Sequence, residues 1–445
     1  MNMLGSLTFL IMHLSTVMTP LFLQGCSNAT CGEGLVSEKT SPSDLNNKIL
    51  EILNATKPCE SLDDCDTVEV SLVPKSRKKT SSERILVIDG GIRLAAYTRY
   101  KSKVLDHLIA NEDGKYVSNP QKIRVPRPIF EVLSNLLDEQ NADTPAFHLN
   151  DVAGEFVKHL KCVDSNSAHG SEIFGTLADL NPEAEFVIAD LIDSYRSGFC
   201  EFYTSKDARE KYKTQLRTAS SSLSTQIMEH EIEYVNMSLG HEREVLEDRW
   251  TRFCSGKVPD SFFELQKTFF TEFYEPLFAN KEVVFVQAAP YSRFGLLENV
   301  DPEFYSDSQN IDNRLAVSGF SEIDPKLPIL GSNNTDYLKD FFKGPWNSVD
   351  VYINFGVMHE RPYRKGPFPV LLSTEGVGAD ALFDRPSTSS ATPVGLSYLN
   401  YLKKSGLIKG SGQELVSNFK NYHQGKLVEP ARYKQFEIYR LGRLP

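Results

Sequence analysis

The feature of the sequence that most constrains the fold is a set of three short, continuous apolar runs. They read "RILVIDGG" from Arg84, "AEFVIADLI" from Ala184 and "NKEVVFVQAA" from Asn280, and helix-length amphipathic segments flank them. Apolar strands of this kind alternate with helices when a parallel sheet is covered on both faces. The sequence therefore predicts an α/β fold of three layers, with a mostly parallel sheet between helices. Ligands of such sheets bind outside the carboxyl ends of the strands.

Composition and charge exclude one class of partner. The chain has 445 residues, 40% of them hydrophobic, which is enough to build a large core. Its net charge of −11 argues against nucleic acid, because phosphate binding needs clustered Lys and Arg. The one basic cluster, Lys75 to Lys79, stands in a Ser-rich polar run and is typical of an exposed linker.

The N-terminus predicts export. Residues 1–25 form an apolar stretch followed by small residues, which is the pattern of a signal peptide. Leu23-Gln24-Gly25-Cys26 resembles the lipobox of bacterial lipoproteins. This resemblance implies a lipid on Cys26 and attachment to the membrane. An ordinary cleaved signal and a single anchoring helix are the alternatives, so we expect a secreted protein or a membrane-anchored lipoprotein of the cell envelope.

Cysteine usage fits an oxidising compartment and gives no sign of a metal site. Without Cys26, six of the seven cysteines remain, enough for three disulfides with fifteen alternative pairings. No C-x-x-C occurs, and His230-Glu231 is followed by Tyr234 where a zinc motif needs a second His. We therefore expect no zinc and no required cofactor. No Asp-rich loop has the ligand spacing of a calcium site, so calcium stays unassigned.

The chain divides into an extension and one large domain. Residues 26–80 are polar apart from "LNNKILEILN" and predict a flexible tether with one short helix. Residues 81–445 carry the strand and helix patterns of the α/β domain. Two stretches within it, at about 97–162 and 241–281, contain long amphipathic or aromatic segments and are predicted to be helical insertions.

Three residues together predict a catalytic site. Asp89 ends a strand, His169 opens one helical pattern and Ser389, in "STSSATP", opens another. Taken singly they fit a turn, a packed histidine and a helix cap. A serine nucleophile needs a base to take its proton and a carboxylate to orient that base, and these three residues supply the set.

Six motifs around these residues resemble those of the subtilisin-like serine peptidases, and the order Asp, His, Ser is the order of subtilisin. The matching segments follow the family's order from about Arg84 to Pro393: "VIDGGI", "HGSEIFG", "VNMSLG", "NRLAVSGFSEID", "VDVYINFG" and "STSSATP". The resemblance implies a subtilisin-like fold and a serine endopeptidase. It also implies that a polypeptide substrate pairs, as an added strand, with Ser238, Leu239 and Gly240.

One departure from the family pattern leaves a second function open. Where the family carries Gly-Asn, whose Asn stabilises the oxyanion, this chain has Pro290-Tyr291 followed by Ser292. Tyr291 and Ser292 are the candidate replacement donors. If neither donates, the chain is a catalytically impaired relative that binds extended peptides or partner proteins.

Overall fold

The structure is a computed structural model of the chain, and the residues it describes belong to the unit Thr40–Pro445. These residues are 42–61, 63–73, 83–92, 99–132, 169–191, 199–238, 247, 250–251, 254, 257–259, 263–288, 311–323, 350–358, 371–373, 376–378 and 388–423.

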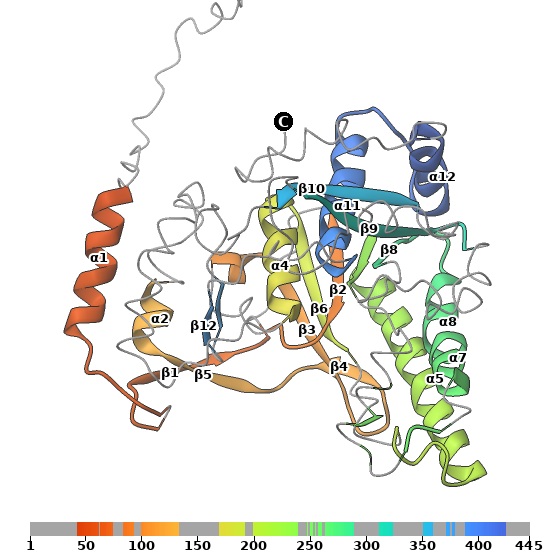
Figure 1. Cartoon of the computed structure of the whole chain (residues 1–445), viewed down its shortest axis with the longest axis horizontal. Coiled ribbons are helices and arrows are strands. Elements are labelled where there is room, and N and C mark those ends of the chain that lie inside the picture. The colour runs from red at the N-terminus through yellow and green to blue at the C-terminus, as the bar shows by residue number, and fades with distance from the viewer. Residues whose placement is uncertain are drawn as a thin grey trace, which may run out of the picture. The chain divides into compact units, whose positions relative to one another are not determined.

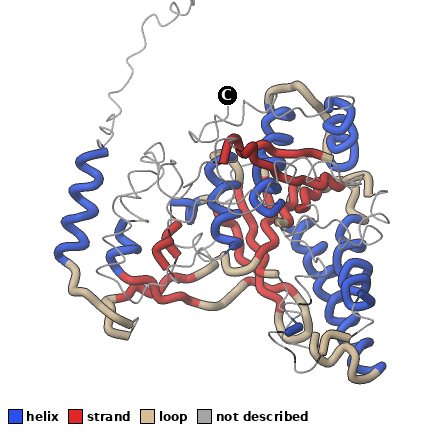
Figure 2. Tube along the Cα trace, viewed as in Figure 1, coloured by secondary structure: helices blue, strands red, loops and turns tan. Residues whose placement is uncertain are grey.

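An eight-stranded sheet runs through the domain in the order β10-β9-β8-β7-β2-β6-β3-β4 (Figures 1 and 2). Every neighbouring pair is parallel except β3 with β4. The mostly parallel sheet predicted from the apolar runs is therefore confirmed. Its strands are β2 (Arg84–Asp89), β3 (Val104–Ala110), β4 (Tyr116–Ser118), β6 (Glu185–Asp190), β7 (Tyr234–Met237), β8 (Val284–Ala288), β9 (Arg314–Ile323) and β10 (Val351–Met358). A separate hairpin pairs β11 (Leu371–Ser373) with β12 (Gly376–Gly378).

Helices pack on both faces of this sheet, which gives the predicted three layers. Alternate residues of β2 enter two different cores: Ile85 and Val87 join the first, and Leu86 and Ile88 join the second. The first core includes side chains of α4 (His169–Leu180), α11 (Thr388–Lys404) and α12 (Gly412–His423). The second includes those of α5 (Lys206–Glu229), α7 (Phe263–Phe269), the π-helical turn η5 (Phe270–Tyr274) and α8 (Glu275–Phe278).

A buried polar network fixes α4 against α11 and sets their direction. The Asn400 side chain of α11 donates to Glu83 and, over 2.9 Å, to the Oδ1 of Asn181. The Asn181 amide, just beyond α4, donates in turn to the Ser397 hydroxyl over 2.8 Å. Because Glu83 immediately precedes β2, this network lies at the amino edge of the sheet. Both helices therefore end there and begin at the carboxyl edge.

The segment after Tyr97 differs from the helical insertion that the sequence predicted. Residues 99–132 contain the short helix η2 (Arg99–Ser102), strands β3 and β4, strand β5 (Lys122–Pro126) and the short helix α2 (Arg127–Glu131). β3 belongs to the main sheet, beside β6. Its apolar run is interrupted by Asp106 and His107, which are both buried, and Ser118 of β4 donates to Asp106 over 2.8 Å. The rest of the predicted insertion lies outside the described residues.

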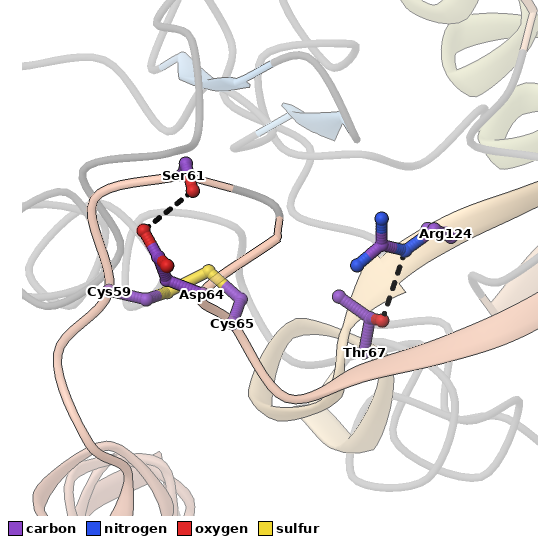
Figure 3. The surroundings of a disulfide bond; sticks show 6 residues. All are labelled: Cys59, Ser61, Asp64, Cys65, Thr67 and Arg124. Atoms are coloured by element: carbon purple, nitrogen blue, oxygen red, sulfur yellow. Dashed lines mark hydrogen bonds between the residues drawn. A yellow bond between two sulfur atoms is a disulfide. The ribbon is translucent and has the colours of Figure 1, made fainter.

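The extension expected to be a flexible tether also holds ordered structure. The predicted short helix is α1 (Pro42–Ala55), and a Cys59–Cys65 disulfide follows it. Strand β1 (Thr67–Ser71) then pairs antiparallel with β5, and the Arg124 side chain donates to Thr67 (Figure 3). The basic cluster at Lys75–Lys79 lies outside the described residues.

A second disulfide joins Cys200 to Cys254. Disulfides persist in oxidising compartments, so both bridges fit a protein that reaches one. The other cysteines, Cys26, Cys31 and Cys162, lie outside the described residues. No helix in the described part of the chain is long and apolar enough to cross a membrane.

The network at the amino edge predicts a large effect of Asn400→Ala. The variant leaves two buried acceptors, on Glu83 and Asn181, without their donor, which costs about 2–3 kcal/mol of unfolding free energy. Urea denaturation measures the change. Asn418→Ala on α12, which removes an exposed hydrogen bond to the Lys409 carbonyl, is the matched control and should cost about 0.5 kcal/mol or less. Equal effects of the two variants would contradict the role of the network.

The raised pKa of the Tyr234 hydroxyl predicts how the free energy of unfolding changes at alkaline pH. Burial, with added repulsion from Glu233 and Glu83, raises the pKa of this hydroxyl well above the ordinary value of 10. The unfolded chain therefore loses this proton first, so unfolding free energy falls as pH rises above about 10, by up to about 1.4 kcal/mol per pH unit. Tyr234→Phe should remove that part of the slope in urea titrations at pH 8 and pH 11. A slope equal to that of wild type would refute the assignment.

Candidate active site

Asp89 and His169 meet at the carboxyl edge of the sheet. Asp89 is the last residue of β2 and is 1% exposed, while His169 is the first residue of α4 and its side chain is 47% exposed. The Nδ1 of His169 lies 2.9 Å from the Oδ1 of Asp89. An ionised carboxylate only accepts, so Nδ1 carries the proton and Nε2, on the opposite side of the ring, keeps a free electron pair. The lone pair of this tautomer is thus on the nitrogen that faces away from Asp89.

Glycines allow the helix to come this close to the strand. A Cβ on Gly170 would lie 2.5 Å from the Gly90 carbonyl oxygen and 2.6 Å from a carbon of Ile92. The Gly170 N–H donates to that same carbonyl over 3.1 Å. Gly91 has a φ of 73°, in the left-handed region that favours glycine. The motif "VIDGGI", residues 87–92, therefore forms the turn that the first residues of α4 contact.

Two further hydrogen bonds fix the pair. The Gly90 N–H donates to Asp89 Oδ1 over 2.7 Å, and the hydroxyl of Ser171, which is fully buried, donates to the Gly91 carbonyl over 2.9 Å. Ser171 stands where the subtilisin-like motif has Thr, and its hydroxyl anchors the helix start to the turn. The second oxygen of Asp89, Oδ2, is buried and has no hydrogen-bond partner in the described part of the chain.

Ser389 lies in the first turn of α11 and is partly exposed. α11 packs against α4 and the two run in the same direction. Ser389 precedes Ser397 by roughly 12 Å of helix, and His169 precedes Asn181 by roughly 18 Å. Because Asn181 contacts α11 at Ser397 and one turn further on, the two helix starts lie at the same edge of the sheet.

Pro393 removes one backbone hydrogen bond from the start of α11. It lies inside the helix, four residues after Ser389. Proline has no N–H, so the Ser389 carbonyl loses its usual helical donor, and the ring crowds that carbonyl. The N–H groups of the first helical turn also have no acceptor within the helix and form the positive end of its dipole. The arrangement can stabilise negative charge near Ser389.

The structure describes part of the remaining predicted site. Ser238 follows β7, is 1% exposed and accepts a hydrogen bond of 3.0 Å from Asn236. Leu239, Gly240, Tyr291, Ser292 and Cys26 lie outside the described residues. No group of three or more His, Cys, Asp or Glu side chains within the described ranges is arranged to hold a metal ion.

Sequence reasoning missed the residues that hold the two helices together. Asn181, Asn400 and Glu83 are far apart along the chain and belong to no motif. The available signal was weak: an Asn on the otherwise apolar face of a predicted helix, as at Asn400, indicates a buried polar contact.

In comparisons with known proteins, no family model and no curated protein matches this chain.

The close approach of Gly170 to the turn after β2 predicts that alanine substitutions at Gly170 and Gly90 will change stability by different amounts. Gly170→Ala places a methyl group against backbone and should destabilise the protein by about 1–3 kcal/mol, while separating His169 from Asp89. Gly90→Ala is the matched control, because no atom lies within 4 Å of its added Cβ. Urea denaturation and the downfield proton NMR signal of His169 Nδ1 report both effects. Retention of that signal in Gly170→Ala would contradict the predicted contact.

Proposed function

We propose that the chain is a serine endopeptidase of the subtilisin-like type. The observation that carries the proposal is the 2.9 Å contact of His169 with buried Asp89, made where α4 begins. The start of α11, with Ser389, lies at the same edge. A buried carboxylate, an exposed imidazole and a serine at a neighbouring helix start are the groups that acyl transfer needs.

In this mechanism each group has one role. His169 Nε2 takes the proton of the Ser389 hydroxyl as its oxygen attacks the peptide carbonyl. Asp89 stabilises the imidazolium that results, and His169 then gives the proton to the leaving amine. An acyl-enzyme on Ser389 remains, and water hydrolyses it by the same proton transfers in reverse order.

The Ser389 N–H, at the positive end of α11, is the proposed first donor to the oxyanion. Tyr291 or Ser292 is the proposed second donor. The polypeptide substrate is proposed to add as a strand beside Ser238, Leu239 and Gly240, so that backbone hydrogen bonds supply affinity. Neither chemistry nor binding requires a cofactor in this scheme.

The proposed location is outside the cytoplasm. The two disulfides support an oxidising compartment. A signal peptide over residues 1–25 and a lipid on Cys26 would attach the protein to the membrane, and secretion after ordinary cleavage is the alternative. Mass spectrometry of the mature N-terminus distinguishes the two, because only a lipoprotein carries a modified Cys26.

The alternative function is peptide or protein binding without catalysis, and the sequence change at Pro290-Tyr291 favours it. Loss of one oxyanion donor costs about 3–4 kcal/mol in subtilisin itself, and the magnitude is borrowed from that enzyme. Such a loss slows hydrolysis without abolishing it. The presence of Asp89 together with His169 favours the enzyme, because a binding protein has no need of this pair.

Labelling with a fluorophosphonate probe tests the proposal. The wild-type chain should be labelled, and Ser389→Ala should not. The labelling rate of His169→Ala should be lower than that of wild type by a factor of roughly 10³ or more, because the serine loses its base. Ser405→Ala, at an exposed serine just beyond α11, is the matched control and should react like wild type. Folded wild-type protein that resists the probe would refute the peptidase and favour the binding protein.

A further inference from the structure

The carboxyl edge of the sheet carries a second aspartate beside the candidate catalytic one. β6 neighbours β2 in parallel, and Asp190, the last residue of β6, is the register partner of Asp89. Neighbouring strands lie about 4.8 Å apart. Phe186 and Ile188 of β6 belong to the core on the α4 side of the sheet. Since side chains alternate along a strand, Asp190 also lies on the α4 side, the side of His169.

A buried histidine lies beside this second carboxylate. His107 of β3 pairs in register with Ile188 of β6, and its Nε2 lies 3.2 Å from the Oδ2 of Asp190. The His107 side chain is 2% exposed, whereas that of Asp190 is 28% exposed. Tyr116 fixes the backbone, because its hydroxyl donates to the Asp190 carbonyl over 3.0 Å. The backbone of Asp190 is thus fixed by Tyr116, and its side chain is partly open to solvent.

The carboxylate of Asp190 is incompletely satisfied. Its Oδ1 is buried without a hydrogen-bond partner in the described part of the chain. Neither Asp190 nor Asp89 is paired with a Lys or Arg there; the side chains recorded beside the two carboxylates are those of His107 and His169. Because Oδ1 is covered, a ligand would meet the exposed part of this carboxylate, and a carboxylate with no permanent cation beside it attracts a cationic donor. The net charge of −11 adds long-range attraction for basic partners.

We propose that Asp190 is a specificity-determining residue that binds a basic side chain, a guanidinium or an ammonium group, of the peptide substrate. This inference rests on the proposed function. β2 lies between β7 and β6, so a peptide aligned beside the end of β7 has Asp89 and His169 next to it and Asp190 one strand further. A long basic side chain pointing across His169 reaches that position. An apolar or acidic side chain gains nothing there.

The experiment measures binding to Ser389→Ala, which cannot cleave the peptide. Fluorescence anisotropy compares peptides that carry arginine with the same peptides carrying citrulline, its neutral isostere, at each of the positions before the cleaved bond. At one position the arginine peptide should bind about 10-fold more tightly or better, as expected for a partly desolvated ion pair. Added Asp190→Asn should abolish that preference, and Asp190→Glu should keep it.

Asp113→Asn, in the exposed turn between β3 and β4, is the matched control for loss of one negative charge and should leave the preference intact. Circular dichroism and urea unfolding verify that the Asp190 variants fold. Equal binding of arginine and citrulline peptides at every position, or a preference that survives Asp190→Asn, would overturn the inference, as would binding of neither peptide.

Fluorophosphonate labelling of the wild-type chain separates this inference from the proposed function. Labelling without a preference that depends on Asp190 keeps the peptidase and removes the acidic subsite. Absence of labelling together with such a preference supports the subsite, in a protein that binds basic peptides without cleaving them.

Discussion

The position of the candidate catalytic residues depends on a buried polar contact at the opposite edge of the sheet. Asn400 joins α11 to Asn181, at the end of α4, and to Glu83, at the start of β2. Lys404 also pairs with Glu83. Burial lowers the pKa of Lys404, but its contacts with Glu83 and Glu183 more than offset this, so the pKa stays above its usual value. The carboxylate of Glu83 therefore has both an amide donor and a cation, which a buried charge requires.

At the opposite, carboxyl edge of the sheet, hydrogen bonds join the start of α4 to the turn after β2. Gly170 allows α4 to touch the turn after β2, so that the His169 ring contacts a carboxylate removed from water. That carboxylate receives two N–H groups on Oδ1 and none on Oδ2. A charge so poorly solvated gains more from a nearby imidazolium than an exposed one would. In the proposed mechanism, this geometry supports the role of His169 as the base.

Local signals in the sequence predicted the strands with continuous apolar runs and the helices that begin at His169 and Thr388. Non-local features gave no such signal. The sequence pattern did not predict β3, because Asp106 and His107 interrupt its apolar run and the residues that contact them lie on other elements. β1 is stabilised by pairing with β5, about 50 residues away along the chain, and by a disulfide. Asp190 ends an apolar run as Asp89 does, but only the order of strands reveals that they are neighbours.

Buried polar atoms without a hydrogen-bond partner occur at both edges of the sheet in the described part of the chain, but at the amino edge the carboxylates lie beside cations, Glu83 beside Lys404 and Glu185 beside Arg84. At the carboxyl ends of the adjacent strands β7, β2 and β6, three buried acceptor oxygens lack a donor in the described part of the chain: Asn236 Oδ1, Asp89 Oδ2 and Asp190 Oδ1. Each such oxygen costs about 1–3 kcal/mol. Folded chains retain unsatisfied groups of this kind mainly where function needs them. This is the edge that the extended basic peptide we propose as substrate would meet, and such a peptide brings both N–H groups and positive charge.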